Sequence, residues 1–290
     1  MTHCLVLVAC QTKAPIEAAL VERLARKHGG RPRWLAPEAA VEIMLDAAPL
    51  RERITAELAG EPVDWALIPA SGRKKQLLIS DMDSTIIDIE CIDELADMVG
   101  IKTEVAAITR RAMNGELDFE AALQARVALL AGVPETAIGE ICASRLQLNP
   151  GARTLVRTMR ANRCLTILVS GGFTAFTAYV AELAGFERHQ GNRLEIEDGR
   201  LTGRVLPPIL GAEAKLASLE AAAAERGLGL GDCLAVGDGA NDRKMLEAAG
   251  LAVAFRPHAV LRRAADLTLD HAGLAGALYL QGYAAADLHH

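Results

Sequence analysis

The chain has 290 residues, enough for two or three domains, and 51% of them are hydrophobic. With 37 acidic and 31 basic residues and no basic run longer than Arg73–Lys75, the charge pattern argues against a nucleic-acid-binding surface. There is no signal-peptide pattern, and no apolar run approaches the ~18–20 residues of a membrane span. The six cysteines form no C-x-x-C pair, which disfavours a disulfide framework or a structural zinc. We therefore expect a cytoplasmic protein with neither nucleic-acid nor membrane partners.

The first ~70 residues follow the pattern of a small α+β domain. Apolar runs and glycine breaks predict the order strand, helix, strand, strand, helix, strand over 4–9, 15–27, 33–35, 41–45, 50–58 and 64–68. This βαββαβ order is the split-βαβ pattern of a ferredoxin-like sandwich. No cluster of catalytic residues falls in it, and 69–75 has the composition of a linker. We predict a domain over 1–72.

The remainder, 76–290, alternates short apolar strands with helical stretches. The strands are expected at 76–80, 165–169, 233–236, 251–254 and 267–269. This alternation predicts an α/β fold with a parallel, Rossmann-like sheet covered on both faces. The interval between the first two strands is far longer than the ~30 residues of a complete βαβ unit. Helical patterns fill it at 93–98, 103–114, 118–131 and 134–145. We therefore predict a helical cap inserted at about 88–149.

Two carboxylates follow the first strand of this sheet. Asp81 and Asp83 come directly after Leu77–Ser80, and residues i and i+2 of an extended chain point to the same side. They should project together beyond the carboxyl end of the strand, where open α/β sheets bind ligands. Taken alone, the pair is more typical of residues that end a strand and cap the next helix than of a functional site.

Further polar groups are expected at the same edge. Ser170-Gly171-Gly172 follows the second strand, and its small residues let backbone N–H groups approach an oxyanion. Lys215 lies at the start of a predicted helix, and Asp238 follows the strand at 233–236. Asp81, Asp83 and Asp238 offer the hard oxygen ligands that Mg²⁺ prefers. Ser170, Gly171 and Lys215 would complete a phosphate cradle, so the convergence of these groups predicts a functional site.

Four segments in this order, 81–85, 170–172, Lys215 and 237–242, resemble the motifs of the haloacid dehalogenase-like phosphohydrolases. Other segments resemble the phosphoserine phosphatases within that superfamily: Asp88-Ile89-Glu90, Met113-Asn114-Gly115, Asp118-Phe119-Glu120 and Arg126-Val127-Ala128-Leu129-Leu130. The resemblance covers about 76–283. Through weaker motifs, the N-terminal segment resembles the ACT-like domain of longer bacterial members.

The resemblance implies hydrolysis of phosphoserine to serine and phosphate, the last step of serine biosynthesis. Asp81 would be the nucleophile that forms an aspartyl-phosphate, and Asp83 would protonate the leaving serine oxygen and then activate water. Mg²⁺ would be bound by the carboxylates of Asp81 and Asp238 and by the backbone carbonyl of Asp83. Asp242 would be a supporting residue behind them.

The resemblance also implies how the substrate binds. Glu90 would hold the ammonium group, Arg126 the carboxylate, and Met113 and Phe119 would pack on the carbon stem. The phosphate would be held by Ser170, Gly171, Lys215 and Asn241. From its spacing alone, Arg126 falls on the apolar stripe of the helix at 118–131. There its guanidinium needs an anion, either the substrate or a neighbouring acid, unless only its carbon stem packs on the stripe and the charged end reaches solvent.

Several alternatives stay open. The scaffold also suits a phosphohydrolase or phosphotransferase acting on another phosphomonoester, or a signalling module in which Asp81 holds phosphate as a switch. The N-terminal domain is a candidate amino-acid sensor, which is compatible with the enzyme. The sequence leaves the oligomeric state open, with a homodimer among the alternatives, and does not distinguish Mg²⁺ from Mn²⁺.

Overall fold

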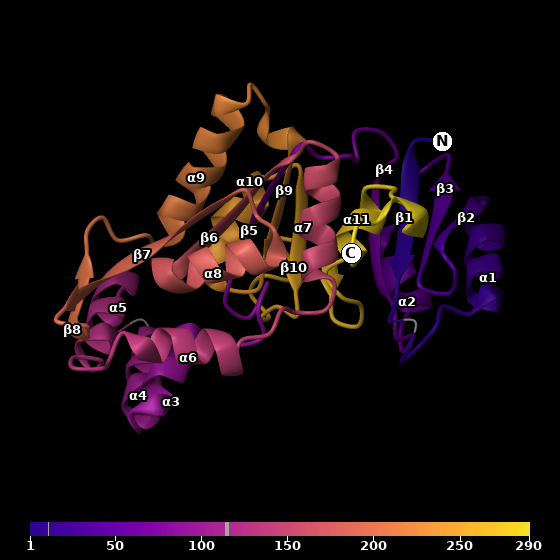
Figure 1. Ribbon diagram of the computed structural model, residues 1–290. Helices are drawn as coiled ribbons and strands as arrows, with labels where there is room; N and C mark the ends of the chain where they lie inside the picture. Colours follow the sequence, from indigo (N-terminus) through magenta and orange to yellow (C-terminus); the bar gives the residue numbers. More distant parts are fainter. Residues whose placement is uncertain (11, 114–115) are drawn as a thin grey trace.

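The computed structural model describes residues 1–10, 12–113 and 116–290, with the side chain of Met113 outside the described part. These residues form one four-stranded and one seven-stranded β-sheet, each with its own helices (Figure 1). The division into domains at 1–72 and 76–290, with an insert at 88–149, stays a prediction.

The four-stranded sheet belongs to the N-terminal part. Its elements, in chain order, are β1 (His3–Val8), α1 (Ala18–His28), β2 (Arg31–Ala36), β3 (Ala40–Leu45), α2 (Arg51–Glu57) and β4 (Asp64–Pro69). The strands pair antiparallel in the order β2-β3-β1-β4. The predicted βαββαβ order is therefore confirmed, whereas the relation to ACT-like domains stays a prediction.

Both faces of this small sheet are buried. Because successive side chains of a strand point to opposite faces, Leu5 and Leu7 of β1 pack with α1 and α2. Cys4, Val6 and Val8 face the other way, into the same apolar cluster as residues of the larger sheet. The element α11 (Gly276–Leu280) contacts β1 and β3 on that side.

Buried charges fix the small sheet to the C-terminal segment. Glu42, which is 2% exposed, is paired with Arg73 at 2.8 Å, and Arg73 also donates to the carbonyl of Leu280 at 3.3 Å. On β4, the Asp64 carboxylate accepts the backbone N–H groups of 270–272. Since breaking a buried pair leaves an uncompensated charge, these contacts stabilise the packing of the small sheet on the C-terminal segment.

The larger sheet carries the predicted strands and two more. In chain order its strands are β5 (Leu77–Ser80), β6 (Leu165–Phe173), β7 (Arg188–Glu197), β8 (Arg200–Leu206), β9 (Cys233–Gly237), β10 (Leu251–Phe255) and β11 (Leu267–Leu269). They are ordered β11-β10-β9-β5-β6-β7-β8, parallel except for β8, which runs antiparallel to β7. The prediction of a parallel sheet missed the hairpin β7–β8, whose residues are largely polar and half-exposed instead of forming an apolar run.

Helices cover the two faces of this sheet. The face towards α7 (Ala152–Ala161) and α8 (Thr174–Ala184) receives Leu78 of β5, and the opposite face, towards α9 (Ala212–Glu225) and α10 (Arg243–Ala248), receives Leu77 and Ile79. With both faces covered, the side chains available for a site are those at the strand ends, and open α/β sheets bind ligands at the carboxyl ends.

The cap is helical, as the interval between the first two strands predicts. It consists of α3 (Cys91–Met98), α4 (Lys102–Met113), α5 (Phe119–Ala128) and α6 (Thr136–Ser144). The predicted end of the second cap helix at Asn114 lies outside the described residues. In Figure 1 these helices lie together beyond one end of the large sheet, and the hairpin β7–β8 reaches out to α5.

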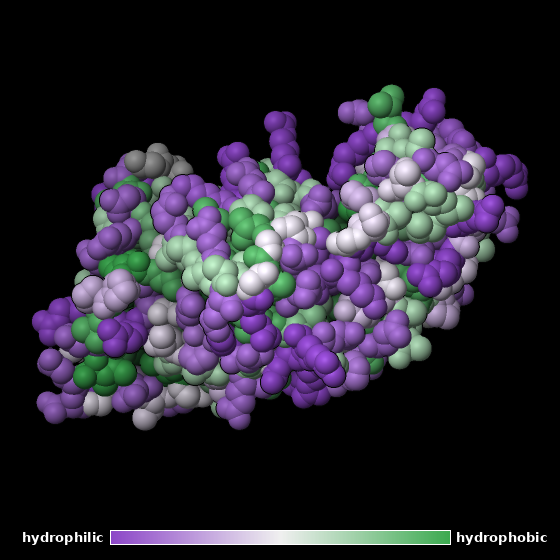
Figure 2. All heavy atoms as spheres, turned by 90° about the horizontal axis from the view of Figure 1, so that it is seen from above, coloured by the Kyte–Doolittle hydropathy of each residue, from purple (hydrophilic) through white to green (hydrophobic). Residues whose placement is uncertain are grey.

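On the face drawn in Figure 2, hydrophilic residues predominate and apolar residues occur in small separate groups. Among the helices in the described ranges, none combines the length and hydrophobicity needed to cross a bilayer.

Candidate active site

A cavity of about 370 Å³ lies between the carboxyl ends of the strands and the cap. The carboxyl end of β6 and the segments after β5, β9 and β10 form its floor, and α3 and α5 supply its other wall. It is lined by Asp81, Asp83, Glu90, Ile92, Phe119, Leu123, Arg126, Ser170, Gly171, Gly172, Phe173, Asp238, Gly239, Ala240, Asn241, His258 and Val260. Its volume falls in the range of small-molecule sites.

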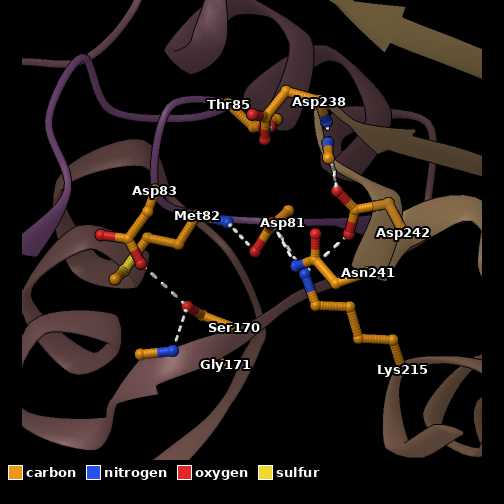
Figure 3. A network of polar contacts seen from close by, with 12 residues as sticks. Asp81, Met82, Asp83, Thr85, Ser170, Gly171, Lys215, Asp238, Asn241 and Asp242 are labelled. Atoms are coloured by element: carbon orange, nitrogen blue, oxygen red, sulfur yellow. Dashed lines mark hydrogen bonds and ion pairs between the residues drawn. The ribbon is translucent and has the colours of Figure 1, made fainter. Parts of the chain in front are cut away.

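The two carboxylates after β5 have different partners (Figure 3). Asp81 continues the strand, with its N–H bonded to the carbonyl of Val236 and its Oδ2 2.7 Å from the ammonium of Lys215. The Asp83 carboxylate turns to the other side, where Oδ1 accepts the N–H of Cys91 at 2.9 Å and Oδ2 accepts the Ser170 hydroxyl at 3.1 Å. One carboxylate is thus held by a cation and the other by neutral donors.

A glycine is required beside Asp83. A Cβ on Gly172 would lie 2.8 Å from Asp83 Oδ2 and 3.0 Å from Ser170 Oγ. The Gly172 N–H also donates to that hydroxyl at 2.8 Å. The Ser-Gly-Gly sequence therefore brings the second strand end close enough to orient Asp83.

Lys215 lies behind Asp81 and not on the cavity wall. The helix that carries it, α9, begins at Ala212, earlier than the sequence predicts. The side chain is 1% exposed, and its Nζ is 2.7 Å from both Asp81 Oδ2 and Asp242 Oδ1. Burial opposes the charged ammonium, but the Asp242 and Asp81 carboxylates outweigh burial and raise the pKa of Lys215.

Three carboxylates crowd around this lysine. Asp81, Asp238 and Asp242 each place an oxygen within 4.8 Å of the others. Burial, followed by the Asp242 charge, raises the pKa of Asp81, and burial likewise raises the pKa of Asp238 to about 6, although the Thr85 hydroxyl donates to it at 2.8 Å. One ammonium does not neutralise three carboxylates, and hard oxygens at this spacing fit a divalent cation.

The three carboxylates of this cluster are not the same three residues that the resemblance implies as ligands of the metal. The Asp83 carboxylate is not part of it, and the resemblance assigns only the backbone carbonyl of Asp83 to the ion. Asp242 is the third member, but its oxygens already accept Lys215 and the N–H groups of Asp238 and Gly239. Asp242 is therefore placed to orient the loop and the lysine, as a supporting residue would be.

The cap side of the cavity carries an acid, a base and an aromatic ring. Glu90 Oε1 accepts the Ser84 hydroxyl at 2.6 Å, and burial together with the Asp83 charge raises the pKa of Glu90 to about 7. The Arg126 guanidinium donates from Nε to the Ala122 carbonyl of its own helix at 3.3 Å. Across the described ranges, no carboxylate lies within ion-pair distance of Arg126. The sequence predicts either the substrate or a neighbouring acid as the anion for Arg126. Within the described ranges, the neighbouring acid is not found.

Phe119 closes the cap against the floor. A Cβ on Gly171 would lie 3.0 Å from its ring, and one on Gly211 would lie 3.1 Å from it. A side chain on either glycine would crowd the ring, so glycine at both positions allows Phe119 to pack there. Because Gly171 lies in the last part of β6 and Gly211 precedes α9, this contact joins α5 of the cap to two segments of the floor.

The structure brings most of the predicted site residues together. Those that line the cavity are Asp81, Asp83, Glu90, Phe119, Arg126, Ser170, Gly171, Asp238 and Asn241. Lys215 contacts Asp81 of this group from behind, Asp242 accepts the N–H of Asp238, and the side chain of Met113 lies outside the described residues.

Sequence reasoning missed several residues of the site. His258 and Val260 line the cavity after β10, and the strand-end argument used for β5, β6 and β9 would have found them. Ser84 and Thr85 act through their hydroxyls on Glu90 and Asp238. No spacing rule pointed to these contacts: Ser84 meets Glu90 only through the turn between β5 and α3, and Thr85 and Asp238 are 153 positions apart in the chain.

Comparison with known proteins agrees with this geometry. Residues 78–247 match the family model described as haloacid dehalogenase-like hydrolase. A phosphoserine phosphatase of Archaeoglobus fulgidus is 42% identical over 233 residues, covering 80% of this chain and 67% of the relative. One of Streptomyces coelicolor is 43% identical over 251 residues, covering 85% of this chain and 61% of the relative, so the chain spans only about three fifths to two thirds of these relatives.

A solved structure has the same arrangement over nearly the whole chain. The crystal structure of a probable phosphoserine phosphatase from Vibrio cholerae, in its unliganded form, superposes with a TM-score of 0.80 at 31% identity. The match covers 98% of this chain and 88% of that one, so it includes the N-terminal sheet. The family match, the relatives and the carboxylates at the strand ends agree, and the chain belongs to the haloacid dehalogenase-like hydrolases, among relatives that are phosphoserine phosphatases.

Proposed function

We propose that this protein is a phosphoserine phosphatase, which hydrolyses O-phospho-L-serine to L-serine and phosphate as the last step of serine biosynthesis. One observation carries the proposal. The cavity holds the Asp81 and Asp83 carboxylates on its floor and a separated acid and base, Glu90 and Arg126, on its cap side. This arrangement complements a phosphate at one end of a small molecule and an ammonium and a carboxylate at the other.

The reaction takes two steps in this proposal. The Asp81 carboxylate attacks phosphorus, the bond from phosphorus to the serine oxygen breaks, and Asp83 gives that oxygen its proton. Water then attacks the aspartyl-phosphate, Asp83 takes the proton of the water, and the bond to Asp81 breaks. The two donors on Asp83, Cys91 N–H and the Ser170 hydroxyl, hold its carboxyl in one orientation for both transfers.

We assign the divalent cation as Mg²⁺, held by the carboxylates of Asp81 and Asp238 and by the backbone carbonyl of Asp83. When bound, it would neutralise the charge that develops on the transferring phosphoryl group. The carboxylate oxygens of Asp81, Asp238 and Asp242, which lie within 4.8 Å of one another with the single ammonium of Lys215 beside them, support this assignment.

Recognition of the phosphate and of the serine part would use different elements. Ser170, Gly171, Lys215 and Asn241 would hold the phosphate. On the cap side, Glu90 would bind the ammonium and Arg126 the carboxylate, with Phe119 and Met113 packed on the carbon stem. Closing the cap would exclude water from the reaction, and opening it would release serine.

Replacing Arg126 with Ala tests the serine part of the proposal. We expect KM for phosphoserine to rise about 10–100-fold, since a charge-assisted hydrogen bond is worth roughly 1.5–3 kcal/mol. KM for phosphoethanolamine, which has no carboxylate, should change by less than about 3-fold. Steady-state phosphate release with both esters measures this, and equal effects on the two would refute the role.

A matched control is available on the cap. Arg110 lies on α4, exposed and away from the cavity, so Arg110→Ala removes the same charge from the cap without touching the site. It should leave both KM values unchanged. If Arg110→Ala also lost selectivity for phosphoserine, the rise in KM in Arg126→Ala would come from the net charge of the cap and not from the position of Arg126.

The remaining expectations concern the whole protein. An amino-acid ligand at the N-terminal domain, a homodimer and a cytoplasmic location stay predictions. Calorimetric titration of serine into the full-length Arg126→Ala variant, in which serine binding at the active site is weakened, tests the first, and an absence of binding heat would count against it.

A further inference from the structure

Asn192 is a fully engaged buried amide beside the proposed phosphate site. It lies on β7 and is 1% exposed. Its Nδ2 donates to the carbonyls of Gly171 at 2.8 Å and Leu210 at 3.2 Å, and its Oδ1 accepts the N–H of Leu210 at 2.7 Å. Two carbonyls and one N–H fix the orientation of the amide, because only NH₂ donates and only oxygen accepts.

The partners of Asn192 belong to two different parts of the floor. Gly171 lies in the Ser-Gly-Gly segment that lines the cavity. Leu210 directly precedes Gly211, the residue before α9, which carries Lys215. A single side chain therefore joins the segment of Ser170 and Gly171 to the start of the helix of Lys215.

The backbone explains why an amide is needed there. The pairing of β6 with β7 shifts register between Val169 and Phe173, so the Ser-Gly-Gly segment leaves the regular ladder. Backbone groups that leave a ladder inside a protein require other partners. The side chain of Asn192, which pairs with Phe173 in the register, supplies one to the Gly171 carbonyl.

The residue before Asn192 is adapted to the same segment. A Cβ on Gly191 would lie 3.1 Å from the Thr174 nitrogen and 3.2 Å from the Gly172 carbonyl oxygen. Glycine lets β7 approach the Ser-Gly-Gly segment, and the hydrogen bond from Asn192 to the Gly171 carbonyl then holds that segment in place. The ring of Phe119 rests on Gly171 and Gly211, the segments that Asn192 joins.

We propose that Asn192 is a positioning residue for phosphate binding, which sets the Ser170–Gly171 segment against the start of α9. This rests on the proposed function, in which Ser170, Gly171 and Lys215 hold the phosphate. Asn192 does not line the cavity, so it acts through these groups. Its loss should weaken the binding of the phosphate common to every ester, without regard to the serine part.

The test compares Asn192→Asp with a matched buried amide. Asn192→Asp keeps the shape and the acceptor but sets a carboxylate against two carbonyls. Gln281 is 2% exposed, accepts the Lys75 N–H at 3.0 Å and donates to the Ala277 carbonyl at 3.2 Å, remote from the cavity. Gln281→Glu should lower the melting temperature as Asn192→Asp does. The decisive readouts are KM for phosphoserine and for phosphoethanolamine, and the inhibition constant of inorganic phosphate.

For Asn192→Asp we expect all three constants to rise at least about 10-fold by a common factor, and for Gln281→Glu to change by less than about 3-fold. An inhibition constant for phosphate within about 3-fold of the wild type, or equal to that of Gln281→Glu, would overturn the proposal. If Asn192→Asp does not fold, Asn192→Ala gives the same comparison. If phosphoserine is not a substrate, the proposed function fails, yet phosphate inhibition with whichever ester is hydrolysed still decides the role of Asn192.

Discussion

Replacing Asp81 with Asn is expected to lower kcat for phosphate release by at least about 10⁴-fold, the scale of losing a covalent nucleophile. The amide retains the shape of the side chain but cannot form the aspartyl-phosphate. Lys215 keeps its second partner, Asp242, at 2.7 Å. Colorimetric phosphate release measures the loss, and intact-mass spectrometry of acid-quenched reactions should find a phosphorylated protein in the wild type only.

A measurement of stability distinguishes the loss of kcat in Asp81→Asn from a loss caused by misfolding. Burial and the Asp242 charge raise the pKa of Asp81, so its carboxylate form is disfavoured in the folded protein and lowers stability above the ordinary pKa of an aspartate. Asp81→Asn should therefore unfold at the same or a higher denaturant concentration at neutral pH. Residual turnover above about 1% of the wild type in a well-folded variant would contradict the assignment of Asp81 as nucleophile.

Replacing Lys215 with Met should abolish turnover and lower the free energy of unfolding by about 3–5 kcal/mol near pH 8, the cost of leaving a buried charge without its partner. The side chain is 1% exposed and lies between two carboxylates. Removing the ammonium leaves Asp81 and Asp242 facing one another. Urea denaturation of wild type and variant measures the difference.

The pH dependence of this loss has a definite sign. The pKa of Asp81 is raised by burial, and without the lysine this carboxyl takes up a proton more readily as the pH falls. The stability deficit of Lys215→Met should therefore shrink between pH 8 and pH 5.5. Lys244, exposed and paired with Glu213, provides the control: Lys244→Met should cost less than about 1 kcal/mol at either pH. A deficit equal to that of the control, or one independent of pH, would show that Lys215 is not the buried counter-charge.

The floor of the site could be predicted from the sequence because its logic is local. Asp81, Ser170 and Asp238 each lie within two residues of the end of an apolar run, and parallel strands bring their carboxyl ends to one edge. The cap could be predicted because the interval before Leu165 is too long for a single connection. In both cases the prediction depends on residues that are close together in the sequence.

The parts that escaped prediction depend on contacts between distant segments. The hairpin β7–β8 is polar and half-exposed, so no apolar run marks it, although its turn at Asp198 and Gly199 adopts positive φ as tight hairpins require. Asn192 lies within that hairpin, and its partners are known only once the register shift in β6 is seen. The role of Lys215 as a phosphate ligand stays a prediction, and its position behind Asp81 depends on the packing of α9.

The most direct test of the central claim is phosphate release from O-phospho-L-serine, measured with Mg²⁺ and with EDTA. We predict turnover that EDTA abolishes and excess Mg²⁺ restores, with kcat/KM for phosphoserine at least about 100-fold above that for phosphoethanolamine, since one recognition group is lost in the latter. No release from phosphoserine alongside turnover of another phosphomonoester would contradict the substrate and the roles of Glu90 and Arg126. A stable phosphoprotein without turnover of any ester would contradict the enzyme itself and favour a phosphate switch.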